Sequence, residues 1–157
     1  MAKSHRRNQQ QTDTESALQV TSEYVAAMAA RDSGRMDSLR SPDFGLDFVH
    51  TDAFESGPLS AQDAQRFWPV WFAAFPEMDY HVTRTIVAEK VIVMQWVFTG
   101  ANTGPLEPPV FERHIEPTGR TIRFRGVSIY DVSDGLIQRE AIYLDFATIL
   151  VELGVEW

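Results

Sequence analysis

The sequence predicts an α+β fold in which helices come first and strands follow. Residues 14–39 carry apolar side chains at helical spacing, whereas residues 80–144 contain β-branched and aromatic runs divided by turn residues. Strands and helices do not alternate along the chain, so nothing calls for a parallel sheet. We therefore expect early helices packed on a strongly bent antiparallel sheet, with an apolar pocket between the two layers.

The composition fits one globular domain. The chain has 157 residues, of which 44% are hydrophobic, and this is enough to bury a single core without metals or cross-links. No apolar run approaches the roughly 20 residues that a membrane-spanning helix needs, so we expect a soluble protein. The absence of cysteine excludes disulfides and thiolate catalysis.

The charges divide the chain into a basic start and an acidic body. The formal net charge is −8, although the first twelve residues contain basic side chains and no acidic one. We expect residues 1–13 to be a disordered tail and residues 14–157 to form one domain. An acidic body repels phosphate groups, so neither nucleic acid nor a membrane is an expected partner. The basic start lacks the apolar stretch of a secretory signal, which makes a cytoplasmic location the expectation.

The helical region should consist of two helices. Residues 14–39 have the pattern of a long amphipathic helix, which Asp32-Ser33-Gly34 interrupts before a short second helix, and Ser41-Pro42-Asp43 ends it. Residues 44–49 can then form a short strand. Residues 51–58 are expected to be a loop.

A third helix and a run of strands follow. The helix should begin at Ser60, because Ser60 and Asp63 have the spacing of a capping box, and it contains Pro69 and the richest aromatic cluster of the chain. The turn Ser133-Asp134-Gly135 should join the last two strands as a hairpin, and Gly154 should end a final helix. The expected strands are residues 80–88, 91–100, 121–132 and 137–144, and the final helix is residues 146–153.

Asp145 is the first candidate for a catalytic residue. It ends the last strand between apolar neighbours, and an acid in apolar surroundings has a raised pKa that suits it to give and take a proton. Tyr143 should share its face by strand alternation and could donate a hydrogen bond to a developing enolate. The alternative reading is that Asp145 caps the final helix.

Further candidates line the expected pocket or its mouth. His50 follows a strand within a polar cluster, and a histidine can titrate near neutral pH. Aromatic side chains such as Trp68, Phe72 and Trp96 either form the core or bind a flat apolar ligand. Arg125 either binds a carboxylate in the pocket or pairs with acids on the outer face. No histidine spacing typical of a metal site is present, so no metal is expected, and the sequence contains neither a Gly-x-Gly-x-x-Gly motif nor a phosphate loop.

Several short motifs occur in an order that resembles the SnoaL-like polyketide cyclases of the NTF2-like superfamily. The resemblance covers the chain from about Glu15 onward. The matching segments are Phe75-Pro76-Glu77-Met78, Thr99-Gly100-Ala101-Asn102-Thr103-Gly104 after a strand with Trp96, Pro117-Thr118-Gly119-Arg120, Arg125-Gly126-Val127-Ser128, Asp134-Gly135, and Asp145 nine positions before Gly154.

The resemblance implies a cone-shaped α+β barrel, often dimeric or tetrameric through the outer face of its sheet, that works without cofactor or metal. It implies that Asp145 is the general acid/base in an intramolecular aldol cyclisation of a hydrophobic polyketide. The chain departs from the family at Asn102, where a histidine is common, and at Ala141-Ile142-Tyr143, where a Trp-rich strand is common. Asn102 is accordingly a candidate substrate-binding residue.

Two other functions remain open on the same fold. One is a ketosteroid-isomerase-like or epoxide-hydrolase-like enzyme, for which Arg125, Glu112 and Asp131 are the available helpers of a hydrolase. The other is a non-catalytic module that binds a small hydrophobic molecule.

Overall fold

The computed structural model describes residues 2–49 and 57–156. Its helices and strands follow the predicted order of helices first and strands later, which confirms the α+β class. The elements are α1 (Ala2–Ala29), α2 (Ser33–Ser38), β1 (Arg40–Val49), β2 (Leu59–Ser60), α3 (Ala61–Ala74), β3 (Asp79–Ala88), β4 (Val91–Ala101), β5 (Thr121–Ser133), β6 (Leu136–Leu144) and α4 (Phe146–Leu153).

The six strands form one curved, mixed sheet in the order β2-β1-β6-β5-β4-β3. The expectation of a wholly antiparallel sheet is wrong, because β1 pairs with β6 in parallel, with Leu46 opposite Glu140. Most of the domain lies between β1 and β6 in the sequence. No short turn connects the two strands, so the sequence does not indicate whether they run parallel or antiparallel. The outermost strands β2 and β3 are not neighbours in this order, so the sheet curves without closing into the expected barrel.

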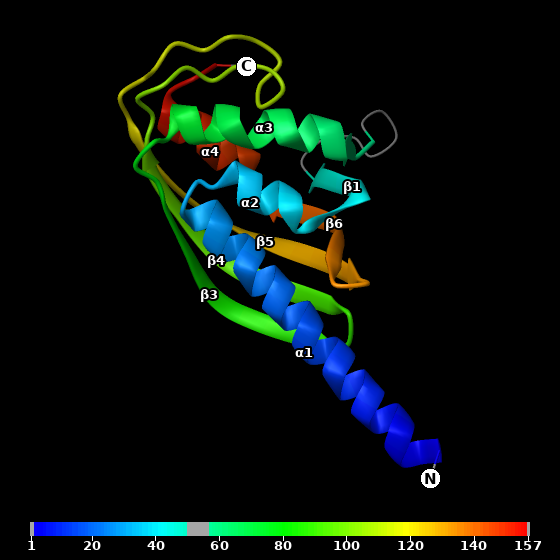
Figure 1. The fold of residues 1–157 in the computed structure, drawn as a ribbon. Helices are drawn as coiled ribbons and strands as arrows, with labels where there is room; N and C mark the ends of the chain where they lie inside the picture. Colours follow the sequence, from blue (N-terminus) through cyan, green and yellow to red (C-terminus); the bar gives the residue numbers. More distant parts are fainter. Residues whose placement is uncertain (1, 50–56, 157) are drawn as a thin grey trace.

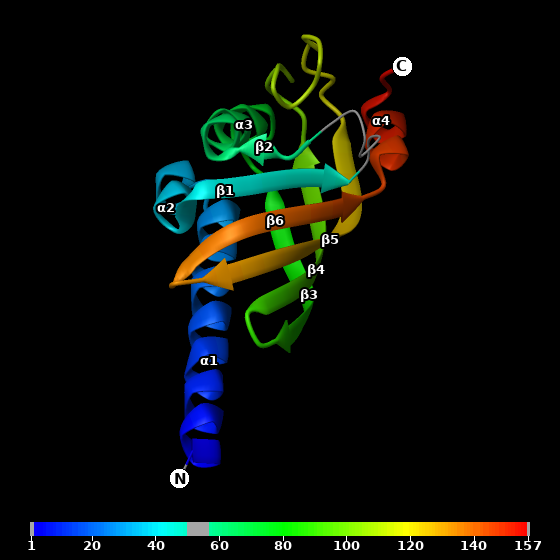
Figure 2. The same cartoon turned by 90° about the vertical axis from the view of Figure 1, so that its right-hand side faces the viewer.

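The helices α1 and α3 lie against the curved sheet, and α4 closes its far end (Figures 1 and 2). Where residues 1–13 were predicted to be a disordered tail, the backbone is helical from Ala2, and this part of α1 projects beyond the sheet (Figure 1). Contacts four residues apart support the helix, such as the hydrogen bond from Gln9 to Asp13 at 3.2 Å. Asp13 also lies 3.8 Å from Lys90 in the β3–β4 turn.

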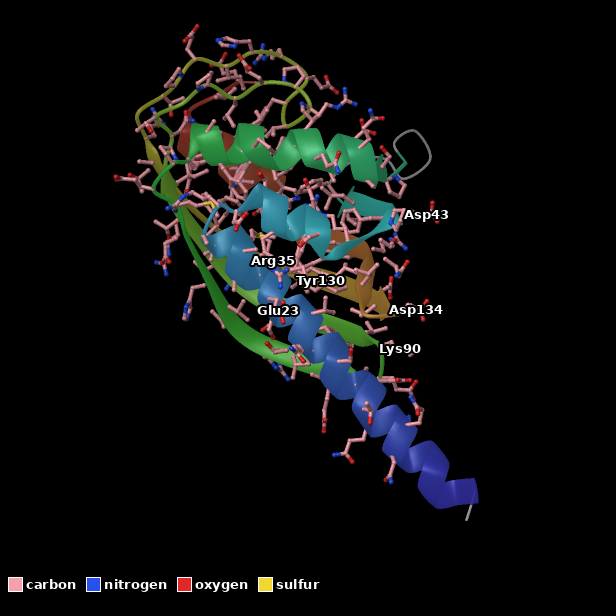
Figure 3. The ribbon with its side chains drawn as sticks, in the orientation of Figure 1. Glu23, Arg35, Asp43, Lys90, Tyr130 and Asp134 are labelled. Atoms are coloured by element: carbon pink, nitrogen blue, oxygen red, sulfur yellow. The ribbon has the colours of Figure 1, made fainter. Side chains whose placement is uncertain are left out.

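An ion pair joins the first two helices. Arg35 of α2 pairs with Glu23 of α1, and the two side chains point toward one another in Figure 3. Asp32, at the predicted break, caps α2 by accepting a hydrogen bond from the Arg35 N–H at 2.9 Å. The predicted interruption of the helical region is therefore confirmed.

Local signals elsewhere also predicted the structure well. Ser60 and Asp63 form the expected capping box at the start of α3. The β5–β6 turn has φ values of 53° at Asp134 and 71° at Gly135, and Gly154 ends α4 at a φ of 71°. Glycine adopts such positive values without a steric cost. No helix among residues 2–49 and 57–156 is both long and apolar enough to cross a membrane.

Candidate active site

A cavity of about 410 Å³ lies between the concave face of the sheet and the helices α1, α3 and α4. Side chains from every long strand contribute to its wall, and the loop at residues 108–112 lies over one side. The wall is mainly aromatic and aliphatic, with few polar groups. Those polar groups are Trp68, Trp71, Tyr80, Trp96, Glu112, Ser128 and Glu140.

Glu140 is the carboxylate in this wall that is completely buried, with an exposed fraction of 0%. It belongs to the face of β6 that also contributes Ile142 and Leu144 to the cavity. Strand alternation directs these three side chains to one side of the sheet. A regular strand therefore holds an ionisable carboxyl group inside an apolar cavity.

The Glu140 carboxyl is the end of a buried hydrogen-bond chain. Its Oε2 accepts a hydrogen bond from the Tyr24 hydroxyl at 3.0 Å. The Tyr24 oxygen in turn accepts from the Arg40 guanidinium, from Nη2 at 3.0 Å and from Nε at 3.2 Å. Arg40 also donates to Asp37 at 2.5 Å. This series of hydrogen bonds therefore runs from Glu140 in the cavity wall to the half-buried carboxylate of Asp37.

Burial raises the pKa of Glu140 to about 7. The Tyr24 hydrogen bond and the positive charge of Arg40 act in the opposite direction and lower it. Among the described residues Glu140 Oε1 has no hydrogen bond of normal geometry, although the hydroxyls of Tyr130 and Ser128 lie near enough to lower the carboxyl pKa further. A carboxyl group with a pKa near 7 can both accept and return a proton in neutral solution.

The phenols around Glu140 stay protonated. Desolvation raises the pKa of Tyr24, Tyr80 and Tyr130 well above their ordinary value of 10.0, and the nearby Glu140 charge raises them further. Tyr130 is buried on β5 (Figure 3), and the register of the two strands places it opposite Glu140 of β6. The Tyr80 hydroxyl, which lines the cavity, can therefore donate a hydrogen bond to a ligand, whereas Tyr24 donates to the carboxylate, and none of the three phenols competes as a base.

A glycine in β5 makes room for the indole ring on the cavity wall. A Cβ atom at Gly126 would lie 2.5 Å from Trp96 Cζ2 and 2.8 Å from the Tyr143 carbonyl oxygen. The space left by Gly126 lets the Trp96 ring lie against β5, where its Nε1 donates a hydrogen bond to Ser128 at 3.0 Å. The glycine of the Arg125-Gly126-Val127-Ser128 motif thus shapes the cavity beside Glu140.

The expectation of a raised pKa at Asp145 is wrong. Asp145 is exposed and caps α4, where its side chain accepts hydrogen bonds from the Thr148 hydroxyl at 2.7 Å and the Thr148 N–H at 3.2 Å. These bonds lower the pKa of Asp145. Its apolar neighbours Leu144 and Phe146 turn toward the cavity and leave the carboxylate outside. The alternative reading of Asp145 as a helix cap therefore describes its position.

Replacing Asp145 by Ala is expected to lower the melting temperature by a few degrees, because α4 loses its capping acceptor. Since the pKa of Asp145 is lowered in the folded chain, the stability that its ionised form contributes is present above the ordinary pKa and is lost as the pH falls through the folded value. Melting curves at pH 7 and pH 3 test this. A difference between wild type and variant that is as large at pH 3 as at pH 7 would contradict it.

Two other predicted site residues lie outside the cavity. Tyr143 has an exposed fraction of 46% and is on the outer face of β6, so it shares no cavity with a catalytic acid. Arg125 is exposed on the outer face of β5, in line with the alternative reading of this residue. His50 lies outside the described residues.

Of the remaining predicted binding residues, two line the cavity and two are buried outside its wall. Trp68 and Trp96 line the cavity, whereas Phe72 is buried behind it and packs on Trp68 with ring centroids 5.8 Å apart. Asn102 is buried and fastens a loop: its Nδ2 donates to Gly104 O at 2.9 Å, and its Oδ1 accepts from Thr118 N at 2.8 Å. Asn102 therefore has a structural position rather than a place in the cavity wall.

Glu140 did not appear among the predicted site residues. It stands in the polar run Gln138-Arg139-Glu140, which is typical of a solvated strand end. The available signal was its position two residues before Ile142 and four before Leu144, since strand alternation places all three on the core side. Within the described part of the chain, no three His, Asp or Glu side chains gather as a set of metal ligands.

The family model described as SnoaL-like polyketide cyclase matches residues 19–153. The chain belongs to this family. No curated protein matches the sequence.

Solved structures of similar fold include candidate polyketide cyclases and a candidate ketosteroid isomerase. A candidate SnoaL-like polyketide cyclase from Jannaschia sp. CCS1 is 16% identical with a TM-score of 0.77, over 92% of this chain and 96% of that one. IdmH, a candidate polyketide cyclase of Streptomyces antibioticus, is 22% identical with a TM-score of 0.67, over 88% and 99%. A candidate ketosteroid isomerase of Kribbella flavida DSM 17836 is 18% identical with a TM-score of 0.60, over 85% and 80%. At these identities the likeness establishes the fold alone.

Proposed function

We propose that this SnoaL-like chain is a cofactor-independent acid/base enzyme in which Glu140 moves a proton on a carbon next to a carbonyl group. The observation that carries the proposal is a fully buried carboxyl group with a pKa of about 7 on the wall of an apolar cavity. The aromatic wall suits a flat, hydrophobic substrate of polyketide type. In this proposal Glu140 takes the role that the family resemblance implied for Asp145.

The proposed reaction is an intramolecular aldol cyclisation. The Glu140 carboxylate takes a proton from the substrate C–H, and the electron pair of that bond becomes an enolate. The enolate carbon attacks a second carbonyl carbon of the same molecule, which forms the ring C–C bond and an alkoxide. The alkoxide then takes the proton back from Glu140, so the enzyme ends as it began. The low polarity of the cavity keeps water away from the enolate.

Proton exchange on a simple ketone tests the proposal without the natural substrate. 2-Tetralone is a flat bicyclic ketone with an acidic C–H next to its carbonyl group. The wild-type protein in D₂O should accelerate the loss of this C–H signal in the proton NMR spectrum, with a rate that rises as the pH passes through 7. A rate equal to that of buffer at every pH would favour the non-catalytic binding module instead.

A ketosteroid-isomerase-like reaction is the second candidate, because the same carboxyl group could return the proton to a different carbon and a candidate isomerase is among the structural neighbours. Epoxide hydrolysis has less support. Of its three expected helpers, Glu112 lines the cavity, whereas Arg125 and Asp131 belong to the outer face of β5. Oxygen-18 from solvent in the product would identify a hydrolase.

We also propose that two copies associate through the outer face of the sheet. Apolar side chains form adjacent rows across this face, from Ile86 through Val93 and Ile129, and from Val127 through Tyr143 to Val49. Ile86, Tyr143 and Val49 are exposed in the single chain, at 42%, 46% and 36%. A second copy offers the same apolar rows, and the face is then buried on both sides.

Tyr143→Glu should therefore convert a dimer to a monomer, because it introduces a charge that would be buried at the interface. Light scattering coupled to size exclusion measures the mass directly. Val151→Glu on α4, which is 75% exposed away from these rows, is the matched control and should leave the mass unchanged. A wild-type mass of one chain at micromolar concentration would contradict the proposal.

A further inference from the structure

The hydrogen atoms of the Glu140 network can be assigned from chemistry alone. A guanidinium group only donates hydrogen bonds, so both bonds from Arg40 end on lone pairs of the Tyr24 oxygen. The hydroxyl hydrogen of Tyr24 must then serve the one remaining contact, with Glu140 Oε2 at 3.0 Å. Oε2 is therefore an acceptor whatever the charge of the carboxyl group.

The Tyr24 and Arg40 hydrogen bonds leave the second carboxyl oxygen, Oε1, unused, and Oε1 is buried beside the hydroxyls of Tyr130 and Ser128. Oε1 has no hydrogen bond of normal geometry among the described residues. When Glu140 gains a proton, the Tyr24 hydrogen opposes its addition at Oε2, so the proton belongs on Oε1. The two oxygens of the Glu140 carboxyl group thus have different roles: Oε2 accepts the Tyr24 hydrogen bond, and Oε1 carries the added proton.

We infer that Tyr24 and Arg40 are positioning residues, because Arg40 directs the Tyr24 hydroxyl onto Oε2 of Glu140 and leaves Oε1 as the oxygen that takes and returns the proton. The inference deepens the proposed function and rests on it for the role of Oε1. Neither Tyr24 nor Arg40 lines the cavity, so both act through Glu140 rather than on the substrate.

The network also keeps the carboxyl group ionisable. Burial alone would hold Glu140 protonated, and a protonated carboxyl group is no base. The Tyr24 hydrogen bond and the Arg40 charge oppose this effect. The groups that face Glu140 from the surrounding elements are Tyr24 on α1, Arg40 on β1, Tyr80 on β3, and Ser128 and Tyr130 on β5, with Asp37 of α2 behind Arg40.

Tyr24→Phe is the decisive variant, since it removes the hydroxyl and keeps the buried ring. We expect the midpoint of the Glu140 carboxyl titration, measured by ¹³C NMR on glutamate-labelled protein, to rise by about one pH unit. Exchange of 2-tetralone should fall about fivefold at pH 7, because the ionised fraction of the carboxyl group falls from about one half to about one eleventh, and it should return toward the wild-type rate above pH 9, where the group is again ionised. Glu140→Gln assigns the NMR signal.

Tyr130→Phe is the matched control. It removes a buried phenol hydroxyl that also lies near Glu140 but has no hydrogen bond of normal geometry in the described structure. The midpoint of the Glu140 titration should therefore rise by less than half as much in Tyr130→Phe as in Tyr24→Phe. Arg40→Lys keeps the charge but loses the planar fork, and its midpoint should rise less than that of Tyr24→Phe. An unchanged titration midpoint in Tyr24→Phe, or a loss of exchange equal at every pH, would overturn the inference.

The titration needs no turnover, so the two proposals can fail separately. If Glu140→Gln retains exchange while Tyr24→Phe moves the carboxyl midpoint, the proposed function fails and the account of Tyr24 and Arg40 as groups that tune Glu140 stands. If Glu140→Gln abolishes exchange and Tyr24→Phe leaves the midpoint unmoved, the positioning role fails and the catalytic role stands.

Discussion

Replacing Glu140 by Gln is expected to reduce the exchange of 2-tetralone by at least about 100-fold, which is the loss typical of a missing general base. Glutamine has nearly the same shape and can still accept the Tyr24 hydrogen bond, so the cavity should keep its form. The amide cannot take a proton at neutral pH. The residual rate should no longer rise through pH 7, because the group with the pKa of about 7 is gone.

Asp145→Asn is the matched control for this variant. It also converts a carboxylate near the end of β6 to an amide, but at a position that is exposed and caps α4. We expect the exchange rate of Asp145→Asn to stay within about twofold of the wild-type rate. If Asp145→Asn abolishes exchange and Glu140→Gln does not, then the catalytic acid is the residue that the family resemblance implied.

The second large effect concerns stability and pH. The pKa of Glu140 is about 7 in the folded chain, against an ordinary value of 4.5, and this difference corresponds to about 3 kcal/mol. Below pH 4.5 the Glu140 carboxyl group is protonated in both the folded and the unfolded chain, so its ionisation does not lower the stability of the folded state. Between pH 4.5 and pH 7 the unfolded chain releases the proton first, so the folded state loses stability as the pH rises.

Glu140→Gln should therefore gain stability relative to wild type by about 3 kcal/mol between pH 4.5 and pH 8. Urea unfolding at a series of pH values measures the difference. Other titrating groups, such as His114 with its pKa raised by Glu116 and Glu107, are present in both proteins and cancel in the subtraction. A difference that stays constant with pH would show that the Glu140 pKa is close to 4.5 in the folded chain.

Local chemistry made most of the fold predictable. The cap at Ser60, the break at Asp32 and the turn at Asp134-Gly135 each depend on a few neighbouring residues, and the sequence shows them directly. The direction of β1 was not predictable in this way, because its pairing with β6 joins opposite ends of the chain.

The site was predicted only in part. Trp68 and Trp96 were identified because large aromatic residues bury themselves wherever the fold allows. Asp145 was misjudged because its neighbours in sequence are apolar while its neighbours in space are the free N–H groups of a helix start. Glu140 was missed for the converse reason, since a polar stretch of sequence conceals a residue whose spatial neighbours are Tyr24 and Arg40.

The parallel pairing of β1 with β6 has a kinetic consequence. Tyr24 and Arg40 come from the first third of the chain and Glu140 from the last, so their meeting closes a loop of about a hundred residues. Contacts so distant in sequence form slowly, because the loop between them must close first. A ribosome-bound chain that has not yet released β6 cannot assemble the hydrogen-bond network of Tyr24, Arg40 and Glu140, so the proton transfer proposed for Glu140 should become available only when nearly the whole chain has been synthesised.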